Sequence, residues 1–145
     1  MLGHIISKEG IKIDPNRVEG ILKIDTLHSK KEVQSFLGKV NFLRRFILNL
    51  VEIIKHITCM LIKGNEIKWN PKARNSFEYI KVELTRAPVL ASTDFTKDFI
   101  MFSFASEHMI VGVLLQKDEQ NFENPIAYFS RTLCNATLRY DIMEK

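Results

Sequence analysis

Three acidic side chains flank two apolar runs in the second half of the chain. Asp94 and Asp98 precede the run at residues 99–104, and Glu107 lies in the polar break before the run at residues 110–115. Clustered carboxylates hold pairs of divalent cations about 4 Å apart in enzymes that hydrolyse phosphodiesters. These three residues fall on expected loops and strand ends, where solvated acids are common. Their positions therefore favour surface carboxylates over a metal site.

The histidines and cysteines show no spacing typical of a metal site. None of the four histidines lies near a nucleophile that it would activate: His4, His28, His56 and His108. Cys59 and Cys134 lie in apolar or mixed surroundings, which predicts buried, reduced thiols. We therefore expect neither a bound metal nor a cofactor.

The strongest candidate for a binding surface is one face of a helix expected at residues 30–48. The apolar positions recur at the spacing of a buried helix face: Val33, Phe36, Leu37, Val40, Leu43 and Ile47. The opposite face carries Lys31, Gln34, Gly38, Phe42 and Arg45. A glycine in a helix interior calls for a reason, because it costs about 1 kcal/mol relative to alanine.

Two interpretations account for this second face. In the first, Gly38 lets the backbone of a nucleic acid approach closely, while Gln34 and Phe42 touch base edges or sugars. Lys31 and Arg45 would then reach phosphate groups. In the second, another helix packs on this face and crosses it at Gly38. The pattern alone leaves both interpretations open.

The charge is distributed unevenly along the chain. Residues 1–63 hold 11 Lys and Arg against 6 Asp and Glu, a net charge of +5, whereas residues 64–145 have a net charge of −1. A basic half indicates a surface that meets polyanions, although a solvated helix surface has the same signature. No apolar run reaches the roughly 20 residues of a membrane span, and no signal-peptide pattern is present. We expect an intracellular protein, cytoplasmic or nuclear.

The elements around these residues predict an α+β fold. Residues 1–13 have the pattern of a short hairpin whose turn ends in Gly10. Asp14 and Pro15 form a helix start, as N-cap and first helical residue. Helical patterns cover residues 15–24, 30–48, 50–63 and 71–86, and Trp69 is expected to anchor the core.

A second, strand-rich part follows the helices. Three strand-length apolar runs, at residues 99–104, 110–115 and 125–130, precede a helical pattern that begins near residue 138. Strand, strand, strand and helix is the order in which one known nuclease fold begins. We therefore expect three antiparallel strands followed by the start of a helix.

A series of short motifs runs along nearly all 145 residues. In order they are LGHIIS, GIKIDP, FLGKVNFLRRFI, IKWNP, SFEYIKVELTRAPVL, DFTKDFI, VLLQ, PIAYFSRTL and RYDIMEK. In this order and at this spacing, the sequence resembles part of the polymerase polyprotein of gypsy-type LTR retrotransposons. No single motif is specific, but together they are highly specific.

The resemblance implies three segments. Residues 1–13 are similar to the primer-grip hairpin at the end of a reverse transcriptase palm, with Leu2, Gly3 and His4 in the grip motif. Residues 14–87 are similar to the helical thumb and its connector. Residues 88–145 are similar to the beginning of an RNase H domain. The resemblance thus implies the first three antiparallel strands and the start of the first helix of an incomplete RNase H-like fold.

The resemblance also favours the nucleic-acid interpretation of the second helix face. In reverse transcriptases, a thumb helix of this pattern tracks the minor groove of the template–primer duplex. Gln34, Gly38 and Phe42 fall where that track runs. The resemblance thus implies an RNA–DNA or DNA duplex as the partner.

The sequence departs from the family at the positions that carry its chemistry. Phe104 stands where the first RNase H aspartate is expected, and we expect it on a buried strand. Glu144 and Lys145 match the pair that precedes the family's catalytic glutamate. The polymerase carboxylates belong to palm and fingers regions that this sequence does not include. Intact relatives use Mg²⁺, which takes oxygen ligands that a phenyl ring does not provide.

We therefore expect a fragment of a reverse transcriptase and RNase H that is not an enzyme by itself. Its inherited role would be weak binding of nucleic acid duplexes. One alternative is a co-opted interaction subunit, which docks on a protein or on itself through the open edge of an incomplete sheet. Another alternative is a relic reading frame without a selected function.

Overall fold

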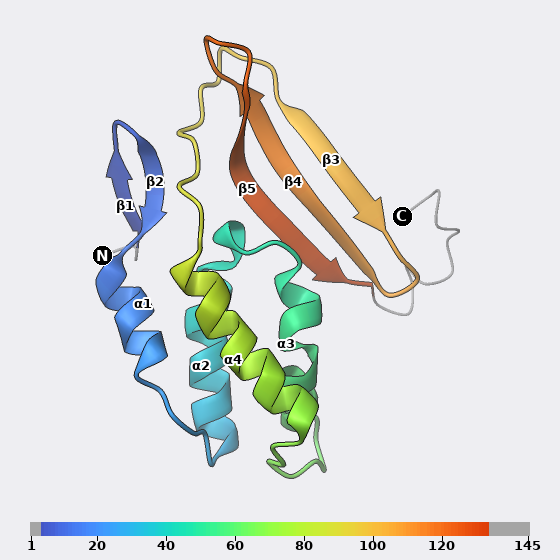
Figure 1. Cartoon of the computed structure of the whole chain (residues 1–145). Coiled ribbons are helices and arrows are strands. Elements are labelled where there is room, and N and C mark those ends of the chain that lie inside the picture. Colours follow the sequence, from blue (N-terminus) through green and yellow to red (C-terminus); the bar gives the residue numbers. More distant parts are fainter. Residues whose placement is uncertain (1–3, 134–145) are drawn as a thin grey trace.

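A helical bundle joins a small hairpin to a larger sheet in the computed structural model, which describes residues 4–133 (Figure 1). The strands are β1 (His4–Ser7), β2 (Gly10–Ile13), β3 (Ile100–Ala105), β4 (Met109–Lys117) and β5 (Glu123–Thr132). The α-helices are α1 (Pro15–Leu22), α2 (Lys30–Phe42), α3 (Leu50–Thr58) and α4 (Pro71–Thr85), with 3₁₀ turns η1 (Arg44–Phe46) and η2 (Cys59–Leu61). None of these described helices is both long and apolar enough to cross a membrane.

Polar side chains fix the starts of three helices. The Asp14 carboxylate accepts a hydrogen bond from the Asn16 backbone N–H at 2.9 Å, as its predicted N-cap role requires. Ser29 and Glu32 form a reciprocal capping box at the start of α2. Asn70 caps α4 by accepting a hydrogen bond from the Ala73 N–H at 2.8 Å. These caps fix the residue at which each helix begins.

The second helix ends earlier than predicted. A continuous helix was expected to residue 48, but α2 ends at Phe42 and the chain continues into η1. In a longer helix, Arg44 would project near the buried stripe, and burying its charge without a partner would be costly. The 3₁₀ turn instead leaves Arg44 exposed and buries Phe46, which is 2% exposed.

The core lies between α2, α3 and α4. Val33, Ile57 and Ile80 contribute one side chain from each helix, and all three are completely buried. Trp69 packs against this core as predicted, with its ring edge-on to Phe77 at a centroid distance of 5.4 Å. Its indole N–H also donates a hydrogen bond to the Leu27 carbonyl at 2.7 Å. The indole therefore ties the loop before α2 to α4.

The prediction of a buried thiol is wrong for Cys59. Its side chain is exposed, because the η2 turn directs Met60 into the core instead. Cys134 lies outside the described residues, as does the helix expected near residue 138.

The larger sheet is an antiparallel meander in the order β3-β4-β5, in agreement with the three predicted strands. β5 lies on the helices, where the Ser130 hydroxyl accepts a hydrogen bond from the Val51 N–H at 3.1 Å. β3 is an edge strand of the described sheet, and its Phe104 side chain is 66% exposed. The expectation that Phe104 is buried is therefore wrong, because no described element covers this part of β3.

A short segment after α4 joins the two sheets. Ile11 and Leu90 form an antiparallel bridge, with N–H to carbonyl distances of 2.7 and 2.8 Å. The next residue, Ala91, donates a hydrogen bond to the Pro125 carbonyl of β5 at 2.7 Å. Gly10 makes the close approach possible, since its φ is +130° and a Cβ there would collide with the Leu90 carbonyl oxygen.

We expect Gly10→Ala to destabilise the chain by about 2 kcal/mol or more, through both the backbone strain and the collision with Leu90. Thermal unfolding followed by circular dichroism measures the effect. The matched control is Gly20→Ala in α1, where a Cβ meets nothing within 4 Å. That variant should be more stable than the wild type by about 0.5–1 kcal/mol. Equal midpoints for the two variants would contradict the proposed role of the junction.

Candidate nucleic-acid interface

An open face runs along α2 on the side away from the core. Lys31, Gln34, Gly38 and Phe42 are all exposed, and all four lie on this helix. A Cβ built at Gly38 meets nothing within 4 Å. The interpretation in which another helix crosses at Gly38 therefore does not hold for the described residues. We call these four residues the α2 face.

The start of this face is fixed by a carboxylate in the first turn of α2. Glu32 accepts a hydrogen bond from the His28 backbone N–H at 2.7 Å and a longer one from the Ser29 N–H at 3.4 Å. The bond from His28 is the main reason that the pKa of Glu32 lies below its usual value. The charged form also suits the positive end of the helix. Glu32 thereby holds the turn from which Lys31 projects.

Arg45 does not belong to the α2 face, and this part of the prediction is wrong. Because α2 ends at Phe42, Arg45 lies in η1, where it is half-buried against the larger sheet. Its Nη2 atom lies 3.5 Å from the Ile126 carbonyl oxygen, a long hydrogen bond. The guanidinium group thus helps to join η1 to β5.

The structure brings two separately predicted sites together at Phe42. The His4 imidazole stacks on the Phe42 ring, with a centroid distance of 5.6 Å and an interplanar angle of 20°. The Arg17 guanidinium carbon lies 6.0 Å from the centroid of the same ring. Leu2 and Gly3 of the predicted grip motif lie outside the described residues. The hairpin, α1 and α2 therefore converge on one aromatic side chain that is 44% exposed.

A groove of about 190 Å³ adjoins this point between α1 and α2. Its lining residues are Asn16, Arg17, Gly20 and Ile21 from α1, with Lys39, Phe42 and Leu43 from α2 and the turn that follows it. Sequence reasoning did not single out Arg17, Gly20 or Lys39. The available signal was the excess of positive charge in residues 1–63, which did not indicate which side chains share a groove.

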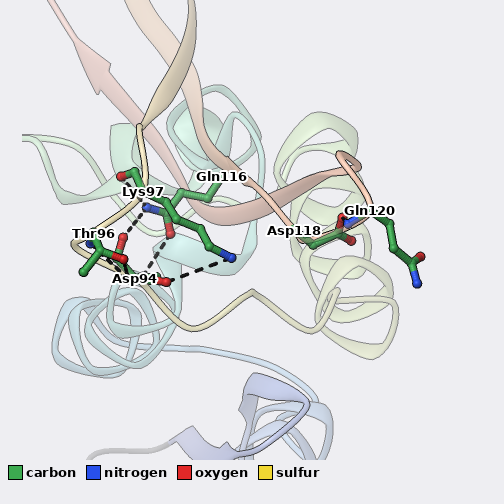
Figure 2. Close-up of polar contacts among 6 residues, drawn as sticks. All are labelled: Asp94, Thr96, Lys97, Gln116, Asp118 and Gln120. Atoms are coloured by element: carbon green, nitrogen blue, oxygen red, sulfur yellow. Dashed lines mark hydrogen bonds and ion pairs between the residues drawn. The ribbon is translucent and has the colours of Figure 1, made fainter.

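The acidic residue Asp94 holds a turn together. Its Oδ1 atom accepts hydrogen bonds from the Thr96 N–H at 3.0 Å and from the Thr96 hydroxyl at 2.6 Å. Buried Gln116 fastens the turn to β4: its side-chain Oε1 accepts from the Asp94 N–H, and its Nε2 donates to the Asp94 and Lys97 carbonyls (Figure 2). The Asp94 carboxylate is thus engaged in local structure.

Asp118 has the same role in the loop between β4 and β5 (Figure 2). Its Oδ1 atom accepts hydrogen bonds from the Gln120 and Phe122 N–H groups, both at 2.9 Å. Asn124 donates to Oδ2 at 3.0 Å. The bond from Phe122 is the largest cause of the lowered pKa of Asp118, and the Thr96 hydroxyl is the largest cause for Asp94.

The acidic side chains near β3 do not converge on one point. Asp94 caps its turn, and Glu107 is highly exposed beside His108, at 3.9 Å from its ring. Across residues 4–133, no three His, Cys, Asp or Glu side chains are grouped so that they could hold a metal ion. Phe104 lies on β3 and its ring contributes no ligand atom.

Comparison with known proteins identifies a related family and its members. The model of a family described as the RNase H-like domain found in reverse transcriptase matches residues 69–145. The chain is 34% identical over 145 residues to the retrovirus-related Pol polyprotein from transposon 297 of Drosophila melanogaster. It is 31% identical over 144 residues to the transposon Tf2-3 polyprotein of Schizosaccharomyces pombe. The alignments cover 99% of this chain but only 13% and 11% of those polyproteins.

Solved structures of similar shape come from a foamy virus. The chain matches the foamy viral protease-reverse transcriptase in complex with an RNA/DNA hybrid, with a TM-score of 0.82 and 29% identity. That match covers 99% of this chain and 20% of the viral one. A second match, to the dRH form of the same protein in complex with double-stranded DNA, has a TM-score of 0.81, 30% identity and coverage of 100% and 25%.

We expect Asp94→Asn and Asp118→Asn each to lower the midpoint of thermal unfolding at pH 7. The difference in midpoint between wild type and variant should become smaller as the pH falls. Because both pKa values are lowered by folding, the charged carboxylates stabilise the native state above the unfolded pKa of about 3.9. This contribution disappears as the pH falls through the folded pKa. Midpoints measured between pH 7 and pH 2.5 test this, with exposed Glu119→Gln as the control. A constant difference between wild type and variant at all pH values would contradict it.

Proposed function

This chain belongs to the family of RNase H-like domains found in reverse transcriptases, and on that basis we propose that it is a nucleic-acid-binding part of a retrotransposon polymerase polyprotein. Its ligand would be the duplex that such an enzyme handles, an RNA–DNA hybrid or double-stranded DNA. Two structural relatives that contain such duplexes support this choice of ligand. The chain spans only a small part of its relatives' length, so the proposal concerns binding.

The proposed organisation follows the three segments that the sequence predicts. Residues 1–13 would act as a primer-grip hairpin, residues 14–87 as thumb and connector, and residues 88–145 as part of an RNase H-like domain. The contact between His4 and Phe42 supports this arrangement, since it places the hairpin next to the α2 face. A duplex on that face would therefore also lie beside the hairpin.

One observation carries the proposal: Gly38 is open to solvent between the exposed side chains of Gln34 and Phe42. A glycine at an exposed helix position lowers stability by about 1 kcal/mol without serving the core. Its benefit is access, because a sugar–phosphate backbone can then lie close to the helix. Gln34 and Phe42 would contact base edges or sugars in the groove, while Lys31 would contact a phosphate.

We expect Gly38→Leu with Phe42→Ala to weaken binding to an RNA–DNA hybrid by about tenfold or more, because a new side chain keeps the duplex away and a contact is lost. Fluorescence anisotropy with a labelled hybrid measures the affinity. Wild-type binding should also weaken as salt rises, since phosphate contacts release counterions.

Two controls separate binding from stability. Gly38→Ala should raise the unfolding midpoint and yet lower affinity, a combination that no loss of folding can produce. Asn75→Leu adds the same leucine side chain to an exposed position of α4 and should leave affinity unchanged. If the Gly38/Phe42 variant binds as tightly as the wild type, the α2 face is not the site.

We further propose that this chain does not hydrolyse RNA. The resemblance places the first catalytic aspartate at Phe104, and a phenyl ring provides no oxygen to Mg²⁺. The carboxylate of Asp94 already accepts two hydrogen bonds from Thr96 within its own turn. A metal-assisted reaction would need several such oxygens converging on one point.

A second candidate function is the docking of a protein on β3. This function is suggested by the apolar side chains that the strand exposes. Met101, Phe102 and Phe104 are 62%, 56% and 66% exposed, and β3 contains no charged residue. An uncharged edge strand of this composition favours pairing with another strand. The partner would be an extended apolar strand, from another protein or from a second copy.

Phe104→Asp should cleave no RNA–DNA hybrid, like the wild type, when assayed with Mg²⁺ or Mn²⁺. Because the Phe104 side chain is exposed, its replacement should remove little packing. The free energy of unfolding should fall by only about 0.5–1 kcal/mol, since aspartate favours a β-strand less than phenylalanine does. Heat denaturation measures this change. The charge should also reduce any self-association seen by sedimentation, because it lies on the docking strand. Cleavage by repurified wild-type chain would overturn the first proposal. A monomeric wild type at all concentrations that also captures no apolar strand peptide would overturn the second.

A further inference from the structure

We propose that the groove between α1 and α2 binds the phosphate backbone of one duplex strand through Arg17 and Lys39. The inference rests on the proposed function and extends it, because it adds a second helix to the binding surface. The duplex would thus be held from two sides. The α2 face would contact a groove of the duplex, and α1 would contact the adjacent sugar–phosphate backbone.

The charge of the groove suits a polyanion. Its lining includes the cationic side chains Arg17 and Lys39 and no acidic residue. The nearest acid along α1 is Glu19, whose carboxylate pairs with Lys23 at 2.6 Å. The residues that line the groove therefore present two positive charges and no carboxylate to a phosphate that enters it.

The guanidinium group of Arg17 is positioned by its contact with Phe42. Its guanidinium carbon lies 6.0 Å from the centroid of the Phe42 ring, close enough for a cation–π interaction. A guanidinium that is already placed loses less conformational freedom when it binds a phosphate bidentately. Phe42 also belongs to the α2 face, so the groove is continuous with the proposed duplex site.

Gly20 supplies the space that a backbone needs on the α1 side. A Cβ built there meets nothing within 4 Å, the same result as at Gly38 on α2. Both glycines are exposed within helices, where alanine would be the more stabilising residue. Two such open positions, one on α1 and one on α2, point to one ligand that passes close to both helices.

The dependence of affinity on salt gives a quantitative test. Each phosphate contact that is lost should reduce the slope of log K against log salt by about 0.9 for a duplex. Arg17→Gln and Lys39→Gln should each lower the slope by about 1, and the double variant by about 2. The probe is a labelled RNA–DNA hybrid, titrated at several salt concentrations between about 50 and 200 mM.

The control is Lys72→Gln, which removes an exposed cation from α4 and should leave the slope unchanged. Unfolding midpoints verify that each variant is folded. Polyglutamate serves as a competitor, because a groove built for acidic peptides would bind it.

Each outcome separates the two proposals. If the wild type binds no hybrid, the proposed function fails. If the Gly38/Phe42 variant loses binding while the Arg17 and Lys39 variants keep the wild-type slope, the proposed function stands and the groove inference is overturned. Displacement of the hybrid by polyglutamate at equal charge concentration would also overturn the groove inference, in favour of an acidic protein partner. A salt-dependence slope that is smaller by about 2 in the double variant supports the groove inference.

Discussion

The pairing of Leu90 with Ile11 is the contact on which the arrangement of the chain depends. Leu90 is completely buried, and its backbone exchanges two hydrogen bonds with Ile11 of the hairpin. One residue later, Ala91 donates to Pro125 of the larger sheet. Two sheets that are far apart in sequence are therefore held by consecutive residues of one extended segment. Gly10 permits this approach, because a side chain there has no room.

The candidate interface depends on this junction although it lies elsewhere. β2 is held at Leu90, and β1 pairs with β2 so that His4 lies opposite Ile13. This register places the imidazole of His4 on the Phe42 ring. A shift of one residue in the hairpin would turn His4 to the other face. The hairpin and the α2 face are thus coupled through backbone geometry.

Sequence reasoning succeeded where a local rule decides the structure. The Asp14 cap, the buried stripe from Val33 to Val40 and the three strands follow from capping and periodicity. It failed where the outcome depends on distant neighbours. Arg45 leaves the α2 face because a 3₁₀ turn buries Phe46, and Phe104 is exposed because β3 lies at an edge of the described sheet. The groove was missed because Arg17 and Lys39 are 22 residues apart in sequence and line the same groove only in the folded chain.

The two open glycines also bear on whether copies of this sequence are still under selection. In a chain that has lost its ligand, almost any other residue at Gly20 or Gly38 would favour the helix, and nothing nearby would resist it. Mutations that replace Gly20 or Gly38 should therefore accumulate quickly by neutral drift, whereas Gly10 would persist in any copy that still folds. The relative survival of glycine at these three positions among sister copies in a genome would distinguish purifying selection for binding from selection for folding alone.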